Sequence, residues 1–336
     1  MKIASVTFNP LTKNVGGGQI PAIAFKEWCD IFGIDCDVVG VLDQVTIGDK
    51  ISPDVNIILE STHFLMLNYY DAIFFSTPII NSSANIEDIR KPFVVMIHGE
   101  NDSKLYGQNT IDDMFNNPSF IDTVHIDVDK YFKEPSTLYW HTCCSPKDLI
   151  QKPIKPKYGN GILYAARITR WLNPELFIYI TSNLITTDNH MYGHCLEQNL
   201  EDKIVSEGSN IRQRLKPFKR GEQYNNKTSL FWDVAGYYGR PFNMKRLSLS
   251  AYEGLKKGRI PIVGKGNAPK LFDGLVLEID QYNFDLKKFM SDYDFFIENN
   301  CVILSKISER LITSHLGYNG VKYQVKRILN KLGVDV

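Results

Sequence analysis

The sequence predicts an α/β protein made of two doubly wound, Rossmann-like halves that face each other across a cleft. A chain of 336 residues is long enough for two domains. In residues 1–150, strand-like and helix-like stretches alternate, as they do in parallel sheets covered by helices on both faces. The alternation restarts after the basic, proline-spaced segment 151–157 (QKPIKPK), which is typical of a linker between domains.

The first half, residues 1–150, has the clearer pattern. From Ile20 to Ile31, apolar residues recur at three- and four-residue spacing, which predicts a helix over 20–32. The run KPFVVMIH at 91–98 is continuously apolar, as in a parallel strand buried on both faces. Strands are predicted over 1–8, 35–41, 54–59, 71–75 and 91–98.

The second half, residues 158–310, repeats the pattern. Strands are predicted over 161–166, 259–264 and 274–279, and a helix over 247–257. The stretch 174–182 fits either a helix or a strand. Residues 318–332 again have helical spacing, so the last segment, 311–336, is predicted to be a C-terminal helix.

Composition narrows the class of protein. The chain is 43% hydrophobic and 12% aromatic, with a formal net charge of +0, which argues against disorder. Residues 1–150 hold 10 Lys and Arg against 20 Asp and Glu, whereas the remainder holds 28 against 18, so we expect an anionic partner to meet the second half. No apolar window is long enough for a membrane helix, and the start MKIASVTF does not resemble a signal peptide, so a cytoplasmic protein without a membrane partner is expected. The six cysteines do not have zinc-site spacing.

The segment 247–264 (LSLSAYEGLKKGRIPIVG) carries the strongest candidate for a binding site. It predicts a helix that ends near Gly258 and is followed at once by a strand. Glu253 lies on this helix, and its carboxylate is able to accept two hydrogen bonds from the hydroxyls of a ribose. The alternative is a solvated glutamate on an ordinary helix.

The run Glu–Gly–x–x–x–Gly–x–Ile–Pro–Ile–Val in this segment resembles the nucleotide-sugar signature of GT-B glycosyltransferases, and most closely that of bacteriophage enzymes that modify DNA. Further segments agree in order: the loop with Gly16, Gly17 and Gly18, the run VVMIHGE at 94–100, and LYAARITRW at 163–171. The resemblance implies the GT-B fold, a UDP-sugar donor, no required metal or other cofactor, and retention of configuration at the sugar. It also implies that residues 311–336 pack back on the first domain.

The resemblance also assigns roles to residues. It implies that Glu253 holds the donor ribose and that His98 lies near the donor sugar and the acceptor, with Glu100 or Asp102 as the acceptor's base. Arg167 and Arg170 would stabilise the charge that develops on the leaving diphosphate. The backbone N–H groups of the loop at Gly16, Gly17 and Gly18 would add donors for the same charge.

The sequence departs from the family pattern at two positions. Lys245 stands where retaining members often have an acid that contacts the donor sugar, and Leu172 stands where a second phosphate-binding cation is usual. Arg170 is the nearest substitute for that cation. The identity of the sugar is therefore left open.

The most basic stretch of the chain is 211–227, IRQRLKPFKRGEQYNNK. The aromatic residues Phe218 and Tyr224 interleave its charges, as in a loop that follows a nucleic-acid backbone. The alternative is a solvated surface loop. The residues predicted to contact DNA phosphates are Arg212, Arg214, Lys216, Lys219 and Arg220.

These features lead to one main hypothesis and three alternatives. The main one is transfer of a sugar from a UDP-sugar to the hydroxymethyl group of a modified pyrimidine, hydroxymethylcytosine, in double-stranded phage DNA, within the cytoplasm of the infected bacterial host. A GT-B enzyme with a cell-surface or capsule glycan as acceptor is the second, and a non-catalytic nucleotide- or nucleic-acid-binding protein is the third. Asp127 and Asp129 also form the DxD pattern with which the other glycosyltransferase fold binds a metal.

Overall fold

The computed structural model describes residues 1–8, 19–42, 51–77, 85–97, 113–125, 138–140, 144–166, 168–185, 188–195, 197–208, 211–214, 222–235 and 247–336. The chain divides into two compact units. Unit 1 comprises Met1–Leu149 and His315–Val336, and unit 2 comprises Ile150–Ser314. The chain thus leaves unit 1 once, forms the whole of unit 2, and returns.

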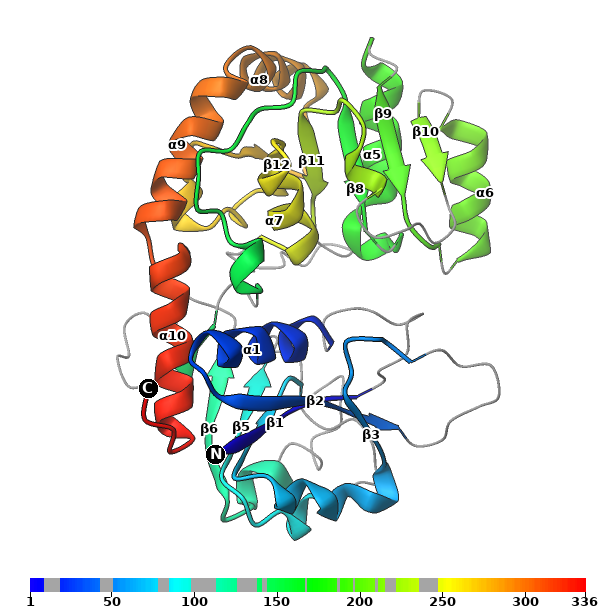
Figure 1. The fold of residues 1–336 in the computed structure, drawn as a ribbon. Helices are drawn as coiled ribbons and strands as arrows, with labels where there is room; N and C mark the ends of the chain where they lie inside the picture. The colour runs from blue at the N-terminus through cyan, green and yellow to red at the C-terminus, as the bar shows by residue number, and fades with distance from the viewer. Residues whose placement is uncertain are drawn as a thin grey trace. The chain divides into compact units, whose positions relative to one another are not determined.

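Unit 1 is built on a parallel sheet with the strand order β3-β2-β1-β4-β5-β6-β7 among the described residues (Figure 1). From β1 the strands β2 and β3 follow toward one edge of the sheet, and the strands from β4 to β7 follow toward the other edge, so the order reverses between β1 and β4. Ligands of such sheets bind at the carboxyl ends of the strands beside this reversal. The strands are β1 (Lys2–Phe8), β2 (Asp35–Leu42), β3 (Ile57–Glu60), β4 (Ala72–Phe75), β5 (Phe93–Ile97), β6 (Phe120–His125) and β7 (Leu138–Tyr139).

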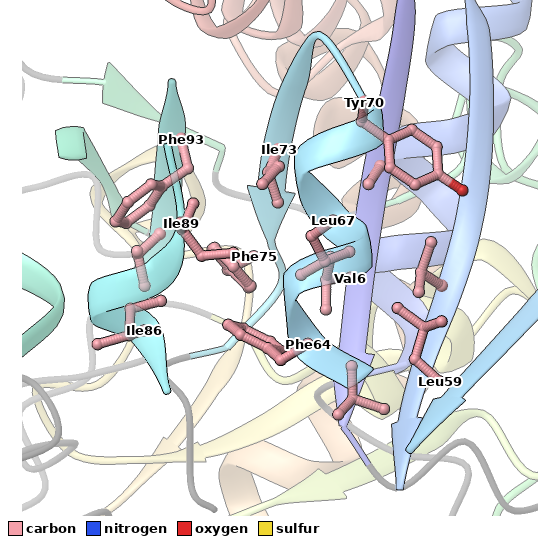
Figure 2. Close-up of a cluster of buried hydrophobic side chains, with 14 of the residues drawn as sticks. Val6, Leu59, Phe64, Leu67, Tyr70, Ile73, Phe75, Ile86, Ile89 and Phe93 are labelled. Carbon is pink, nitrogen blue, oxygen red and sulfur yellow. The ribbon is translucent and has the colours of Figure 1, made fainter. Parts of the chain in front are cut away.

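Both faces of this sheet are covered, because successive strand residues point to opposite sides. Phe74 of β4 stacks on Phe25 of helix α1 (Gln19–Ile31), with ring centroids 4.1 Å apart. Its neighbour Phe75 packs on the other face against Phe64 of the 3-10 segment η2 (Ser61–Tyr69), with centroids 6.0 Å apart. Figure 2 shows this second core, in which Val6 and Phe93 also lie. Unit 1 also contains the short 3-10 segments η3 (Ile86–Asp88) and η4 (Pro146–Asp148).

The C-terminal helix α10 (Tyr318–Lys331) belongs to unit 1. Its buried face, at three- and four-residue spacing, is Val321, Val325, Ile328 and Leu329. The ring of Tyr318 lies against Trp28 of α1, and Lys331 reaches Asp122 of β6 at 4.0 Å. Residues near the two ends of the chain therefore stabilise one core.

Unit 2 is built on a second parallel sheet, with the order β10-β9-β8-β11-β12-β13 among the described residues. This order also reverses, between β8 and β11, so the unit is doubly wound like the first. Its strands are β8 (Ile162–Ala165), β9 (Asn189–Tyr192), β10 (Ile211–Arg214), β11 (Leu230–Asp233), β12 (Ile260–Gly264) and β13 (Leu277–Ile279).

Helices cover both faces of the second sheet as well. Phe177 of α5 (Pro174–Asn183) packs against Trp232 of β11, with centroids 5.4 Å apart. On the opposite face, Gly254 of α7 (Leu249–Lys256) lies directly over Phe231. The other elements are α6 (Gln198–Glu207), α8 (Leu286–Glu298), α9 (Asn300–Thr313) and the 3-10 segments η5 (Arg170–Leu172), η6 (Glu222–Tyr224) and η7 (Lys270–Phe272).

The predicted fold class, α/β with two Rossmann-like parallel sheets, is confirmed by these two topologies. The ambiguous stretch 174–182 is the helix α5. Segment 151–157 is held on unit 2: Ile154 is buried and its N–H donates to Ser308 Oγ at 2.9 Å, and the N–H of Lys157 donates to the backbone oxygen of Gly258 at 3.0 Å. The roles assigned to the two predicted domains stay predictions.

Candidate functional site

Many of the predicted site residues fall outside the described residues. Of the predicted set, Arg170 and Glu253 are described fully, and Arg212 and Arg214 by their backbone. The residues outside the described ranges are Gly16, Gly17, Gly18, His98, Glu100, Asp102, Arg167, Lys216, Lys219 and Arg220, together with Asp127 and Asp129 of the DxD pattern. Their predicted roles stay predictions.

Helix α7, which carries Glu253, is fixed at its N-terminus by two side chains. Ser248 is the N-cap, and its hydroxyl accepts from the N–H of Ala251 at 3.1 Å. The N–H of Ser248 itself donates to Asp233 Oδ2 at 3.0 Å, and Asp233 is the last residue of β11. The helix start is thereby tied to the carboxyl end of a central strand.

The C-terminus of α7 is fixed by glycines. A Cβ on Gly254 would approach Phe231 Cδ2 to 2.5 Å, so only glycine lets the helix lie this close to β11. Gly258 ends the helix with a φ of 86°, and a Cβ there would lie 2.2 Å from the backbone oxygen of Lys155. The chain enters β12 two residues later. The two glycines of this run, Gly254 and Gly258, are therefore explained by packing and by the end of the helix.

The carboxylate of Glu253 is held by a tyrosine. The hydroxyl of Tyr224 lies 3.1 Å from Glu253 Oε2 and 3.1 Å from the backbone oxygen of Ser250, two acceptors for its one proton. Tyr224 is 4% exposed, whereas Glu253 is half-buried. Burial, followed by the charge of Glu253, raises the pKa of Tyr224 above its usual value, so its hydroxyl stays a donor at any physiological pH.

A buried arginine fixes the segment that carries Tyr224. The side chain of Arg259, 0% exposed, donates from Nη2 to the backbone oxygens of Tyr224 (2.9 Å) and Asn226 (3.0 Å), and to Asn226 Oδ1 at 2.9 Å. Its Nε donates to Thr228 Oγ1 at 2.8 Å. Burial lowers the pKa of Arg259 to about 10, which leaves the guanidinium charged at neutral pH. The guanidinium carbon also lies 5.7 Å from the ring centroid of Tyr224, within cation–π range.

Arg170 is engaged with an acid. Its Nε lies 3.0 Å from Oε2 of Glu197, the N-cap residue of α6, and both side chains are partly exposed. An ion pair this exposed contributes little stability, so a bound anion is able to compete for the guanidinium. A role of Arg170 in holding a diphosphate stays a prediction.

The basic stretch begins in the edge strand β10. In the parallel register of β10 and β9, Arg212 lies opposite His190, and Arg214 lies opposite Tyr192. The stretch re-enters the described part of the chain at η6, where Tyr224 is buried. Tyr224 is therefore not available for an aromatic contact with a nucleic acid, because its ring packs in the core of unit 2 and its hydroxyl contacts Glu253.

The sequence interpretation missed two residues of this site. The sequence pattern places Arg259 only at the start of a strand, because arginines are rarely buried. The signal that indicates its burial is its position directly before the apolar run IPIVG. All five residues of that run are buried, so the strand has no solvent-facing side. Tyr224 was grouped with its charged neighbours, and nothing in the sequence pairs it with Glu253, 29 residues later.

The described residues show neither a metal cluster nor a membrane-spanning helix. They contain no group of three or more His, Cys, Asp or Glu side chains placed to hold a metal ion. None of the helices in the described ranges combines the length and the apolar character needed to cross a membrane.

Comparisons with known proteins bear on the fold. No protein-family model matches the sequence, and no curated protein matches it either. Solved structures do match over 99% of both chains. One is an alpha-glucosyltransferase in complex with UDP-glucose and DNA containing an abasic site, at 12% identity and a TM-score of 0.65. Another is Anabaena HepE in complex with UDP and glucose, at 12% identity and a TM-score of 0.66. A third is sucrose-phosphate synthase from Thermosynechococcus elongatus, at 11% identity and a TM-score of 0.67. The chain therefore has the GT-B fold.

Proposed function

We propose that this chain is a glycosyltransferase that transfers a sugar from a UDP-sugar to the hydroxymethyl group of a modified pyrimidine in DNA. The observation that carries the proposal is Glu253, held by Tyr224 on a helix anchored at the carboxyl end of a parallel strand in a GT-B fold. A fixed, half-buried carboxylate at this place suits the two vicinal hydroxyls of a ribose. Two of the similar structures hold UDP or UDP-glucose, which supports the choice of donor.

The chemistry breaks the bond between the anomeric carbon and the diphosphate oxygen and forms a bond to the acceptor oxygen. The acceptor hydroxyl loses its proton to a base, for which Glu100 and Asp102 are the candidates from the sequence. UDP leaves with a negative charge, and Arg167 and Arg170 are the residues proposed to stabilise this charge without a metal. These assignments come from the family resemblance.

DNA is proposed as the acceptor on two grounds. The stretch 211–227 carries several cations on the second half of the chain, and one of the similar structures is a complex with DNA. A base in a duplex must leave the stack to reach any active site, so the acceptor would be a flipped base. A carbohydrate acceptor is the second candidate, since sucrose-phosphate synthase matches with the same coverage.

The test is a transfer assay with a panel of UDP-sugars. Duplex DNA with hydroxymethylated cytosine, the same duplex with plain cytosine, and sugar-phosphate acceptors are offered separately, and product mass is measured after digestion. We expect a gain of one sugar on the hydroxymethylated base. We also expect its loss in Glu253→Ala but not in Glu309→Ala, an exposed glutamate on α9. Transfer to a sugar phosphate alone would replace the DNA acceptor with a carbohydrate, and no turnover of any donor would contradict the enzyme proposal.

A further inference from the structure

We propose that Tyr224 is a positioning residue, whose hydroxyl holds the Glu253 carboxylate in the orientation that binds the donor ribose. The inference rests on the proposed function and adds a residue that the family resemblance does not supply. It starts from one contact: the hydroxyl of Tyr224 is 3.1 Å from Glu253 Oε2.

The first step is the freedom of the glutamate. Glu253 is half-buried on α7, and a glutamate side chain loses rotamer entropy when it is ordered. If a ligand has to order it, that cost is subtracted from the binding energy. A hydrogen bond that orders it in the free protein removes part of this cost. The carboxylate keeps lone pairs for further donors, because two oxygens have about four acceptor positions.

The second step is that Tyr224 is itself immobile. Its ring is stacked beside Phe231, with centroids 6.3 Å apart and an interplanar angle of 26°. Its backbone oxygen is fixed by Arg259 at 2.9 Å, and the guanidinium lies 5.7 Å from its ring centroid. A donor that is buried and fixed on both sides imposes its direction on a partner that is more exposed.

The third step separates positioning from plain stability. Helix α7 is already held by Ser248 at its N-cap, by Asp233 and by the close packing of Gly254 on Phe231. None of these contacts involves Tyr224, so they remain when the tyrosine hydroxyl is removed. Tyr224→Phe therefore removes the hydroxyl that contacts Glu253 Oε2 and the backbone oxygen of Ser250, while α7 keeps these other anchors.

The experiment measures binding of UDP and of 2′,3′-dideoxy-UDP by isothermal titration calorimetry. The second nucleotide lacks both ribose hydroxyls that Glu253 would bind. Wild type, Tyr224→Phe, Glu253→Gln and Tyr293→Phe are compared. Tyr293 is the matched control, a buried tyrosine of the same unit whose hydroxyl donates to the backbone oxygen of Asn160, away from Glu253.

We expect wild type and Tyr293→Phe to prefer UDP over the dideoxy nucleotide. Tyr224→Phe should weaken UDP by roughly tenfold and the dideoxy nucleotide by less than twofold, so that the preference collapses as it does in Glu253→Gln. Equal weakening of both nucleotides by Tyr224→Phe would overturn the inference, because a merely structural role gives that result. An unchanged preference in Tyr224→Phe, with loss of preference in Glu253→Gln, would overturn the inference and leave the proposed function standing. If wild type does not bind UDP, the proposed function fails and the inference falls with it.

Discussion

The indole ring of Trp28 in α1 packs against the phenol ring of Tyr318 in α10, with centroids 5.3 Å apart and planes inclined by 42°. The indole N–H of Trp28 also donates to the backbone oxygen of Cys144 at 3.0 Å. A fully buried tryptophan thus joins three parts of unit 1 that lie far apart in the sequence. Its contact with Tyr318 directly joins helix α10 to helix α1.

Replacing Tyr318 with alanine should therefore destabilise unit 1. We expect the free energy of unfolding to fall by about 1–3 kcal/mol, from lost apolar burial and a lost aromatic pair. Tyr323→Ala is the control, since this tyrosine lies on the same helix and is 61% exposed; it should change stability by less than about 0.5 kcal/mol. Urea titration followed by tryptophan fluorescence measures both. Equal effects would mean that the aromatic contact contributes nothing.

Removal of the buried guanidinium should destabilise unit 2. In Arg259→Met, the oxygens of Tyr224, Asn226 and Thr228 lose their donor in the interior. We expect a loss of about 2–4 kcal/mol, measured by urea titration. The cost is not larger because the guanidinium's hydrogen bonds go to neutral oxygens, so no carboxylate is left uncompensated.

Two further variants check this explanation of Arg259. Arg259→Lys should not restore stability, because an ammonium group lacks the planar fork that reaches several acceptors at once. Arg310→Met should cost less than about 1 kcal/mol, because Arg310 donates to Leu271 and Asp273 at the surface. A stable Arg259→Lys protein would show that charge matters there and geometry does not.

A single methyl group at Gly254 should displace α7. Alanine normally favours a helix by about 1 kcal/mol over glycine, yet here its Cβ would meet Phe231 Cδ2 at 2.5 Å. We expect Gly254→Ala to lose about 1–3 kcal/mol of stability. Gly254→Ala should cost less stability in a Phe231→Leu background than it does in the wild-type background. Additive losses in a double-mutant cycle would contradict the clash.

The stability of unit 1 should depend on the protonation of His315. Burial lowers the pKa of His315 from 6.5 to about 4, so the folded protein keeps this ring neutral where the unfolded chain binds a proton. The contribution is fully present above pH 6.5 and is lost as the pH falls from 6.5 to 4. Urea titrations across this range should show a shallower decline for His315→Gln than for wild type. His63→Gln, at an exposed histidine of η2, should follow wild type, and parallel curves for all three would contradict the prediction.

Salt should separate the DNA contacts from other effects. If the basic stretch contacts phosphates, Lys216→Gln with Lys219→Gln should weaken duplex binding and reduce the slope of log K against log salt by close to 2, at about 0.9 per phosphate. Lys287→Gln with Lys306→Gln, exposed on α8 and α9, is the matched control and should leave the slope unchanged. Fluorescence anisotropy with a labelled duplex gives the slopes. An identical slope in both double variants would mean that the stretch is only a solvated surface.

Some predicted elements have a local sequence pattern, either helical spacing or a continuous apolar run. The helix with Trp28 and the strand IPIVG have a pattern that their own residues make visible. Strand β9, NHMY, is not predicted, because its buried polar residues break the apolar pattern and are satisfied by specific side-chain hydrogen bonds. Asn189 Oδ1 accepts from the N–H of Ile162 at 3.0 Å, and His190 Nδ1 lies 3.1 Å from the hydroxyl of Tyr192. Such pairings do not follow from periodicity.

In the candidate site, too, the residue with a local sequence pattern is predictable, and its partners from other segments are not. Glu253 was identified because a helix, a glycine and a strand follow in a short segment. Its partner Tyr224 comes from another segment, and the clamp by Arg259 on Asn226 exists only once β11 and β12 pair. When the role of a residue depends on contacts among three segments, the local sequence of none of the three segments predicts it.

The path of the chain also sets an order of events during translation. Unit 2 is one uninterrupted stretch, Ile150–Ser314, so all of its residues leave the ribosome one after another with no residues of unit 1 in between. Unit 1 begins earlier but lacks α10, which follows unit 2 in the chain. At about 5–20 residues per second, the first sheet waits roughly 10–30 s with the α10 side of Trp28 uncovered. The unit whose synthesis starts before unit 2 is thus completed only after it, and its apolar surface is left open in the meantime for a chaperone to bind.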